Sequence, residues 1–141
     1  MKGQLEIFRV DKQGKVEVLD VVQNTILDTM YAKLVGLFGG AANTSVNRIQ
    51  LGTGTLDPEE SQTFLQSPIT PIKTVTSAID PADSYSVVFT AYLEDDEGNG
   101  FPISEAGLIT VDNTLVTRTT FSARIKTSSY RFGFRWSIKV K

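Results

Sequence analysis

Apolar and polar residues alternate along several segments of the chain, most clearly near its C-terminal end. Every second residue from Tyr130 to Val140 is aromatic or aliphatic, and the residues between them are arginine, glycine, serine or lysine. A period of two is typical of a strand with one buried face, so we expect a central strand whose aromatic face lies in the core. Further segments of strand-like composition lie at 5–10, 16–22, 48–51, 72–79, 85–93 and 115–121.

The segment from Gly100 to Phe121 predicts two strands joined by a tight turn, and we expect the rest of a β-rich body to form around it. Asp112 and Asn113 lie between the two strands, and both residue types tolerate left-handed or side-chain-bonded turn geometry. β-branched residues dominate the second strand, as a half-buried pleated surface prefers.

Glu105 and Gly107 interrupt the apolar approach to this turn. A glycine within a strand suggests a bulge or a close approach of another backbone segment. An isolated buried carboxylate costs several kcal/mol, so it needs partners. We therefore predict a structural role for both residues, with the Glu105 carboxylate accepting backbone N–H groups or pairing with Arg118 or Arg124.

One segment has helical rather than strand periodicity. Its apolar positions are Ile26, Met30, Leu34 and Phe38, with Leu27, Tyr31 and Val35 in the adjacent row. The spacing predicts one N-terminal amphipathic helix over about residues 25–38. Thr25 with Asp28 resembles a capping box, Asn24 is an alternative cap, and Gly39-Gly40 would end the helix. Because the apolar stripe is broad, we expect this helix to be mostly buried, its stripe serving core packing rather than a cofactor.

The order of predicted elements is a hairpin, a helix and some six short strands. This spacing is typical of an antiparallel β-sandwich, and we expect a jelly-roll-like one with the helix packed on it. The 141 residues contain no internal repeat or dividing linker, so we expect a single domain over 1–141. No apolar run is long enough to span a bilayer, and the N-terminus does not resemble a signal peptide.

The chain contains no histidine and no cysteine. This composition excludes a Ser-His-Asp triad, a thiol nucleophile and the usual histidine or cysteine zinc sites. Only carboxylates, lysine or tyrosine would remain for catalysis. We therefore expect no enzymatic activity, no catalytic residues and no cofactor.

Two short motifs suggest ligand sites, but neither has the full pattern. Gly52-Thr53-Gly54 lacks the remaining glycine and lysine positions of nucleotide-binding loops, so we interpret it as a tight turn. The acidic segment 94–100 partly follows a calcium-loop register, but Ala106 stands where the bidentate glutamate is required. We interpret the segment as a solvated hairpin loop and expect no metal site.

Charge is unevenly distributed along a chain of net charge −2, which offers no bulk attraction for nucleic acid. From 80 to 113 there are acids and no base, and from 114 to 141 there are bases and no acid. One interpretation is complementarity between neighbouring strands within the molecule. The alternative is a bipolar surface that docks head to tail or onto a charged lattice.

Five segments together resemble small structural proteins of tailed bacteriophages. They are VVQNTILDTMYAKLVGLF, RIQLGTGT, SVVFTAYLEDDEGNGFPISEAGLI, NTLVTRTTF and RWSIKV, which lie between Val21 and Val140. The likeness is to capsid cement (decoration) proteins, which are β-sandwich knobs on the mature head. It is also to the N-terminal domain of tail-collar fibre proteins, in which segments like 50–54 and 104–108 recur. No repetitive shaft, collagen-like tract or coiled coil follows, which favours a stand-alone cap or cement.

The resemblance implies a non-enzymatic virion protein, made in the host bacterial cytoplasm and placed on the capsid surface. Its partners would be the major capsid protein, or tail subunits, and further copies of itself, without nucleic acid or membrane. A tail collar or fibre-base protein and a carbohydrate-binding sandwich are the alternatives. We expect contacts from the N-terminal hairpin, from the arm between Pro68 and Pro71, and from a basic face formed by Arg131, Arg135 and Lys139. Charge reversal at Arg131 and Arg135 is expected to weaken attachment to the particle.

Overall fold

The computed structural model describes residues 1–141 and is mainly β, with 57% of the residues in strands and one short helix. The elements are β1 (Lys2–Asp11), β2 (Val16–Gln23), β3 (Thr25–Ile26), α1 (Asp28–Phe38), β4 (Val46–Gly52), β5 (Pro68–Thr74), β6 (Thr76–Asp80), β7 (Asp83–Leu93), β8 (Pro102–Thr110), β9 (Leu115–Ile125) and β10 (Tyr130–Lys139). All strand pairings are antiparallel. The prediction of a mainly β, antiparallel chain is confirmed.

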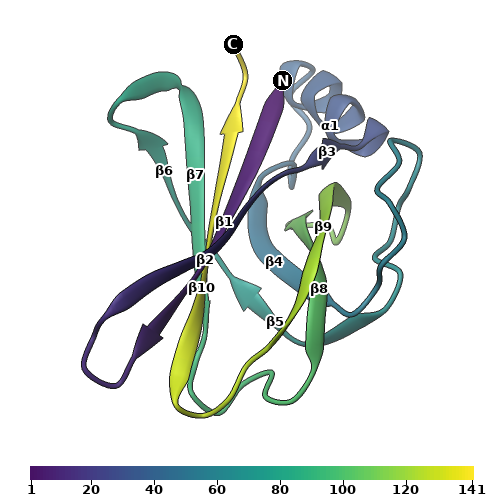
Figure 1. Ribbon diagram of the computed structural model, residues 1–141. Helices are drawn as coiled ribbons and strands as arrows, with labels where there is room; N and C mark the ends of the chain where they lie inside the picture. The colour runs from purple at the N-terminus through teal and green to yellow at the C-terminus, as the bar shows by residue number, and fades with distance from the viewer.

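The strands form two five-stranded sheets, which we call sheet A and sheet B. Sheet A has the order β2-β1-β10-β7-β6, and sheet B has the order β3-β9-β8-β4-β5. β2 leads directly into β3, and β5 leads directly into β6, so the chain passes from one sheet to the other at both sides. These crossings give the molecule a nearly barrel-shaped form (Figure 1).

The main core lies between the two sheets and takes side chains from both. β10 is central in sheet A, where Trp136 pairs with Leu5 of β1 and Phe89 of β7. Its alternating side chains Phe132, Phe134, Trp136 and Ile138 are all buried in one cluster with residues of β4, β8 and β9. The prediction of a central strand with a core-facing aromatic side is confirmed. The three aromatic rings are therefore inaccessible for stacking with nucleic acid bases.

The β8–β9 hairpin has the expected turn. Asn113 adopts a left-handed conformation with φ of 68°, and its N–H donates to Thr110 O at 3.0 Å. Asparagine tolerates this conformation better than most residues, which explains its presence at the turn.

The expected helix begins later than predicted and is not an N-terminal element. α1 covers Asp28–Phe38 and follows three strands, whereas the prediction began at about residue 25. Thr25 and Ile26 instead form β3, because these two β-branched residues pair in extended conformation with β9. Leu27 occupies the N-cap position without a side-chain cap bond, so neither the capping box nor Asn24 caps the helix.

The prediction that this helix is mostly buried is wrong. None of its 11 residues is buried, and Phe38 is 88% exposed. The reason is that α1 lies on the outer side of β9 rather than between the sheets, so only one side of it meets protein. The helix ends before Gly39, as expected. No helix has the length and apolarity needed to cross a membrane.

The segment expected to be one strand at 72–79 is two strands in different sheets. β5 forms the edge of sheet B and includes Pro68 and Pro71, and β6 forms the edge of sheet A. Proline cannot donate a ladder hydrogen bond, which favours an edge position. The arm between Pro68 and Pro71 is therefore the edge strand of sheet B.

Candidate functional site

A buried ion pair on sheet B is the most elaborate polar feature of the molecule. Glu105 of β8 and Arg118 of β9 are 0% and 1% exposed. The guanidinium donates to Glu105 Oε2 through Nη2 at 2.8 Å and through Nε at 3.2 Å. The pair lies on the face of sheet B that is turned away from the main core, because its strand neighbours Ala106 and Leu108 belong to that core.

The Glu105 carboxylate also accepts two backbone hydrogen bonds. Ser67 N–H donates to Oε1 at 2.7 Å, and Gln66 N–H donates to Oε2 at 3.1 Å. Both kinds of partner expected from the sequence are present. Of the two arginines considered, Arg118 is the partner, whereas Arg124 donates to Leu19 O at 2.8 Å. Burial by itself raises the pKa of Glu105, but the Ser67 N–H, Arg118 and Gln66 N–H favour the ionised form and together hold the pKa below its ordinary value.

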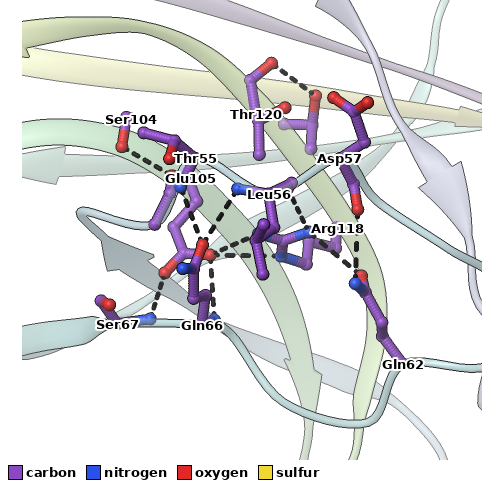
Figure 2. A network of polar contacts seen from close by, with 12 residues as sticks. Thr55, Leu56, Asp57, Gln62, Gln66, Ser67, Ser104, Glu105, Arg118 and Thr120 are labelled. Atoms are coloured by element: carbon purple, nitrogen blue, oxygen red, sulfur yellow. Dashed lines mark hydrogen bonds and ion pairs between the residues drawn. The ribbon is translucent and has the colours of Figure 1, made fainter.

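Arg118 connects this carboxylate to the long loop between β4 and β5, residues 53–67 (Figure 2). Its Nη1 donates to Leu56 O at 2.9 Å and to Gln62 Oε1 at 3.1 Å. Gln66 Oε1 in turn accepts the N–H groups of Thr55 and Leu56, each at 2.9 Å. The loop is thus fastened to sheet B at several points, through groups that are satisfied only when the loop is in place.

The glycines at 52 and 54 make room for the carboxylate. Gly52 pairs with Glu105 across β4 and β8, and a Cβ atom at Gly54 would lie 2.7 Å from Glu105 Oε1. Ser104 Oγ donates to Gly54 O at 2.7 Å. The interpretation of Gly52-Thr53-Gly54 as a tight turn is wrong, since Gly52 ends β4 and the chain continues into the long loop. Close approach of backbone and side chain is the reason for glycine here.

Gly107 has the close approach that the sequence suggested. A Cβ atom there would lie 2.3 Å from Leu115 Cδ1 and 2.9 Å from Thr117 O. Beside it, Leu27, Leu65, Ile109 and Leu115 form a second, smaller core under the helix and the loop. The outer face of sheet B is therefore covered by α1 and by part of the 53–67 loop.

The acidic loop between β7 and β8 surrounds a lysine. Lys126 is 0% exposed, and its Nζ donates to Asn99 Oδ1 at 2.7 Å, to Asp95 O at 3.0 Å and to Thr127 O at 3.3 Å. Of the side chains that suggested calcium, Asn99 bonds this ammonium group, whereas the carboxylates of Asp95 and Glu97 pair with Lys12 and Lys73. No group of three or more carboxylate side chains is placed to hold a metal ion.

The residues expected to form an interface lie on two different sheets. Pro68 and Pro71 are on the edge of sheet B, whereas Arg131, Arg135 and Lys139 are on β10 of sheet A. Two of the three basic residues have partners within the molecule. Lys139 pairs with Asp83 at 3.1 Å, and Arg131 lies 3.8 Å from Glu94 and over the ring of Tyr92. Arg135 alone has no ion pair.

Acids of segment 80–113 thus pair with bases of segment 114–141 inside the molecule. The three pairs are Asp83–Lys139, Glu94–Arg131 and Glu105–Arg118. Asp83–Lys139 joins β7 to β10, and Glu105–Arg118 joins β8 to β9. Glu94, the first residue after β7, pairs with Arg131 of β10. Complementarity between neighbouring strands agrees with these three contacts, whereas Asp95, Asp112 and Glu97 pair with lysines outside the basic segment, Lys12, Lys33 and Lys73.

Sequence reasoning missed a set of apolar side chains on the surface. Phe38, Phe64 and Val35 are 88%, 82% and 72% exposed. The exposure of Val35 and Phe38 was not predicted, because both belong to a broad apolar helical stripe and such a stripe normally indicates burial. Phe64 stands alone in a polar segment, where one aromatic residue carries no periodic signal.

Comparison with known proteins provides no relative from which a function could be transferred. No protein-family model, curated protein or solved structure matches the chain.

Proposed function

We propose that the chain is a non-enzymatic structural protein of a tailed-bacteriophage virion that binds the mature head as a cement protein between major-capsid subunits. The starting point is the resemblance of five segments between Val21 and Val140 to such proteins. The structural observation that supports it best is the amount of apolar side chain left exposed on a well-ordered frame.

The frame has a large shared core, 77 backbone hydrogen bonds and a buried ion pair. On it, Phe38 and Phe64 are almost fully exposed. Large exposed apolar patches on soluble proteins mark sites of protein–protein contact. A cement protein functions by adding such contacts: an interface of about 1,600 Å² suffices for specific attachment, and repetition over a shell increases the total strength.

The proposal includes the finer fold class expected from the sequence, a jelly-roll-like sandwich. The two five-stranded sheets with one shared core support it. In this form the strands that cross between the sheets close the sides of the sandwich.

A tail collar or fibre-base protein is the second candidate, and one observation favours it. The likeness to tail-collar fibre domains rests on segments 50–54 and 104–108, and these two segments are paired in β4 and β8. Gly52, Gly54 and Glu105 form one contact there. Segments with a shared structural purpose are expected to recur together.

The copy number per purified virion tests the proposal and separates the two candidates. Quantitative mass spectrometry would compare this chain with the major capsid protein. Hundreds of copies are expected for a head cement, and a small multiple of three or six for a tail component. Absence from the particle would overturn both.

A further inference from the structure

α1 is attached to the molecule by one side only. On that side, Thr29 Oγ1 donates to Leu115 O, Lys33 pairs with Asp112, and Met30 packs against the main core. The opposite side carries Tyr31, Val35 and Phe38, which are spaced as one helical stripe and are 47%, 72% and 88% exposed. Because most of this stripe is exposed, it contributes little to the packing of the domain.

The 53–67 loop extends the same side of the molecule. Figure 1 shows the loop between β4 and β5 reaching the N-terminal end of α1, where Asp28 N–H donates to Glu60 O at 2.8 Å. The loop leaves Phe64 and Leu56 82% and 61% exposed. We call the set of Tyr31, Val35, Phe38, Leu56 and Phe64 the α1–loop surface.

The buried ion pair fixes the loop part of this surface. Arg118 bonds Leu56 O and Gln62 Oε1, and Glu105 bonds the N–H groups of Gln66 and Ser67. A surface ordered before binding loses less conformational entropy when a partner docks. The arrangement is therefore suited to a stable contact.

Four exposed acids without an ion pair border the α1–loop surface. The bases nearest to it are Lys33, which pairs with Asp112, and Lys2, which lines a groove with Glu60. Asp28, Asp57, Glu59 and Glu60 are exposed, and none of them takes part in any of the chain's ion pairs. These four carboxylates outnumber the one unpaired lysine side chain beside them, so they attract a positively charged partner. Charge complementarity thus indicates a partner with basic residues.

We propose that the α1–loop surface docks a basic, amphipathic segment of a different protein, and this inference rests on the proposed function because the partner would be a shell or tail subunit.

Attachment of purified protein to particles that lack it is the first test. Val35→Asp and Phe38→Asp are expected to weaken attachment at least about tenfold, since each places a charge in the apolar centre of the contact. Ile125→Asp at the end of β9 is the matched control, because Ile125 is 59% exposed and lies outside this surface and outside the segments expected to contact the particle. It should change attachment less than about twofold. Unchanged melting temperatures would show that all three variants fold.

The second test removes negative charge from the border of the surface. The double variant Glu59→Gln/Glu60→Gln should bind more weakly than the wild type at low salt, and its affinity should depend less on salt concentration. Loss of attachment by Arg131→Glu/Arg135→Glu with full attachment of Phe38→Asp would overturn the inference and place the contact on β10. Failure of the wild-type protein to attach at all would overturn the proposed function together with the inference.

Photo-crosslinking identifies the occupant directly. A benzophenone amino acid would replace Phe38 in protein bound to particles, with the same probe at Ile125 as control. A crosslink from position 38 alone to a lysine- or arginine-rich peptide of another virion protein would support the proposal. A crosslink to a second copy of this chain, or to an acidic peptide, would overturn it.

Discussion

Gly52 and Glu105 are so close that a Cβ atom on the glycine would lie 2.3 Å from the Oε1 atom of the glutamate. The same Cβ would lie 2.6 Å from the carbonyl oxygen of Ser67. A side chain can move aside, but this backbone oxygen belongs to the loop that the carboxylate itself holds. The absence of a side chain at Gly52 is therefore a condition for the buried ion pair.

Gly52→Ala is expected to destabilise the protein by about 2–3 kcal/mol, because the loop backbone or Glu105 must shift. Urea unfolding followed by circular dichroism measures the change. Gly36→Ala is the control, since its Cβ would meet only Ala41 Cβ at 3.4 Å and alanine favours the helix. Equal stability of Gly52→Ala and wild type would contradict the close approach.

Glu105→Gln is expected to cost about 3–5 kcal/mol, because it leaves the buried Arg118 without a charged partner. The pKa of Glu105 is lowered in the folded state, so the ionised carboxylate stabilises the fold above about pH 4.5. This contribution is lost as the pH falls through the lower folded pKa. The variant should therefore lose less stability on acidification than the wild type, as urea titrations across this range would show. An unchanged stability and acid dependence would count against the structural role of Glu105.

Lys126→Met is expected to lower stability by about 2–4 kcal/mol, since Asn99 Oδ1 and two backbone oxygens lose their hydrogen-bond donor. Limited proteolysis should cut the variant faster within residues 94–100. Lys12→Met removes an exposed ion pair to the same loop and serves as control. Equal proteolysis of the two variants would indicate that the buried ammonium does not organise the loop.

The ion pair between Lys33 and Asp112 connects α1 to the β8–β9 turn. Lys33, together with Thr110 and Thr114, holds the pKa of Asp112 well below its ordinary value of 3.8. A lowered folded pKa stabilises the fold above the ordinary value and loses its effect as the pH falls. The difference in melting temperature between wild type and Lys33→Met should therefore be largest near neutral pH and shrink in strong acid. A difference that is constant with pH would show that the pair contributes nothing.

Much of the sheet structure could be predicted from local pattern. The alternation in β10 and the turn at Asn113 depend on neighbouring residues, and both are as expected. The boundaries around α1 were less predictable. Thr25 and Ile26 fit a helical stripe, but pairing with β9 keeps them extended, and pairing between distant strands has no local signal.

The candidate site shows the same division. Glu105 and Gly107 stand out in the sequence, because a carboxylate and a glycine interrupt an apolar strand. The sequence does not indicate that Glu105 holds the 53–67 loop, because the loop residues that it bonds lie 38 and 39 positions away in the chain. The long apolar stripe of α1 predicts burial, and only the position of the helix outside sheet B exposes half of it.

The sequence by itself determined that the chain is mainly β, where its central strand and main turn lie, and that Glu105 needs partners, because periodicity, turn propensity and the cost of burying charge act locally. The tertiary structure alone decided which arginine pairs with Glu105, why Gly52 and Gly54 are required, and which apolar residues face outward. These depend on which surfaces meet after the two sheets form their shared core.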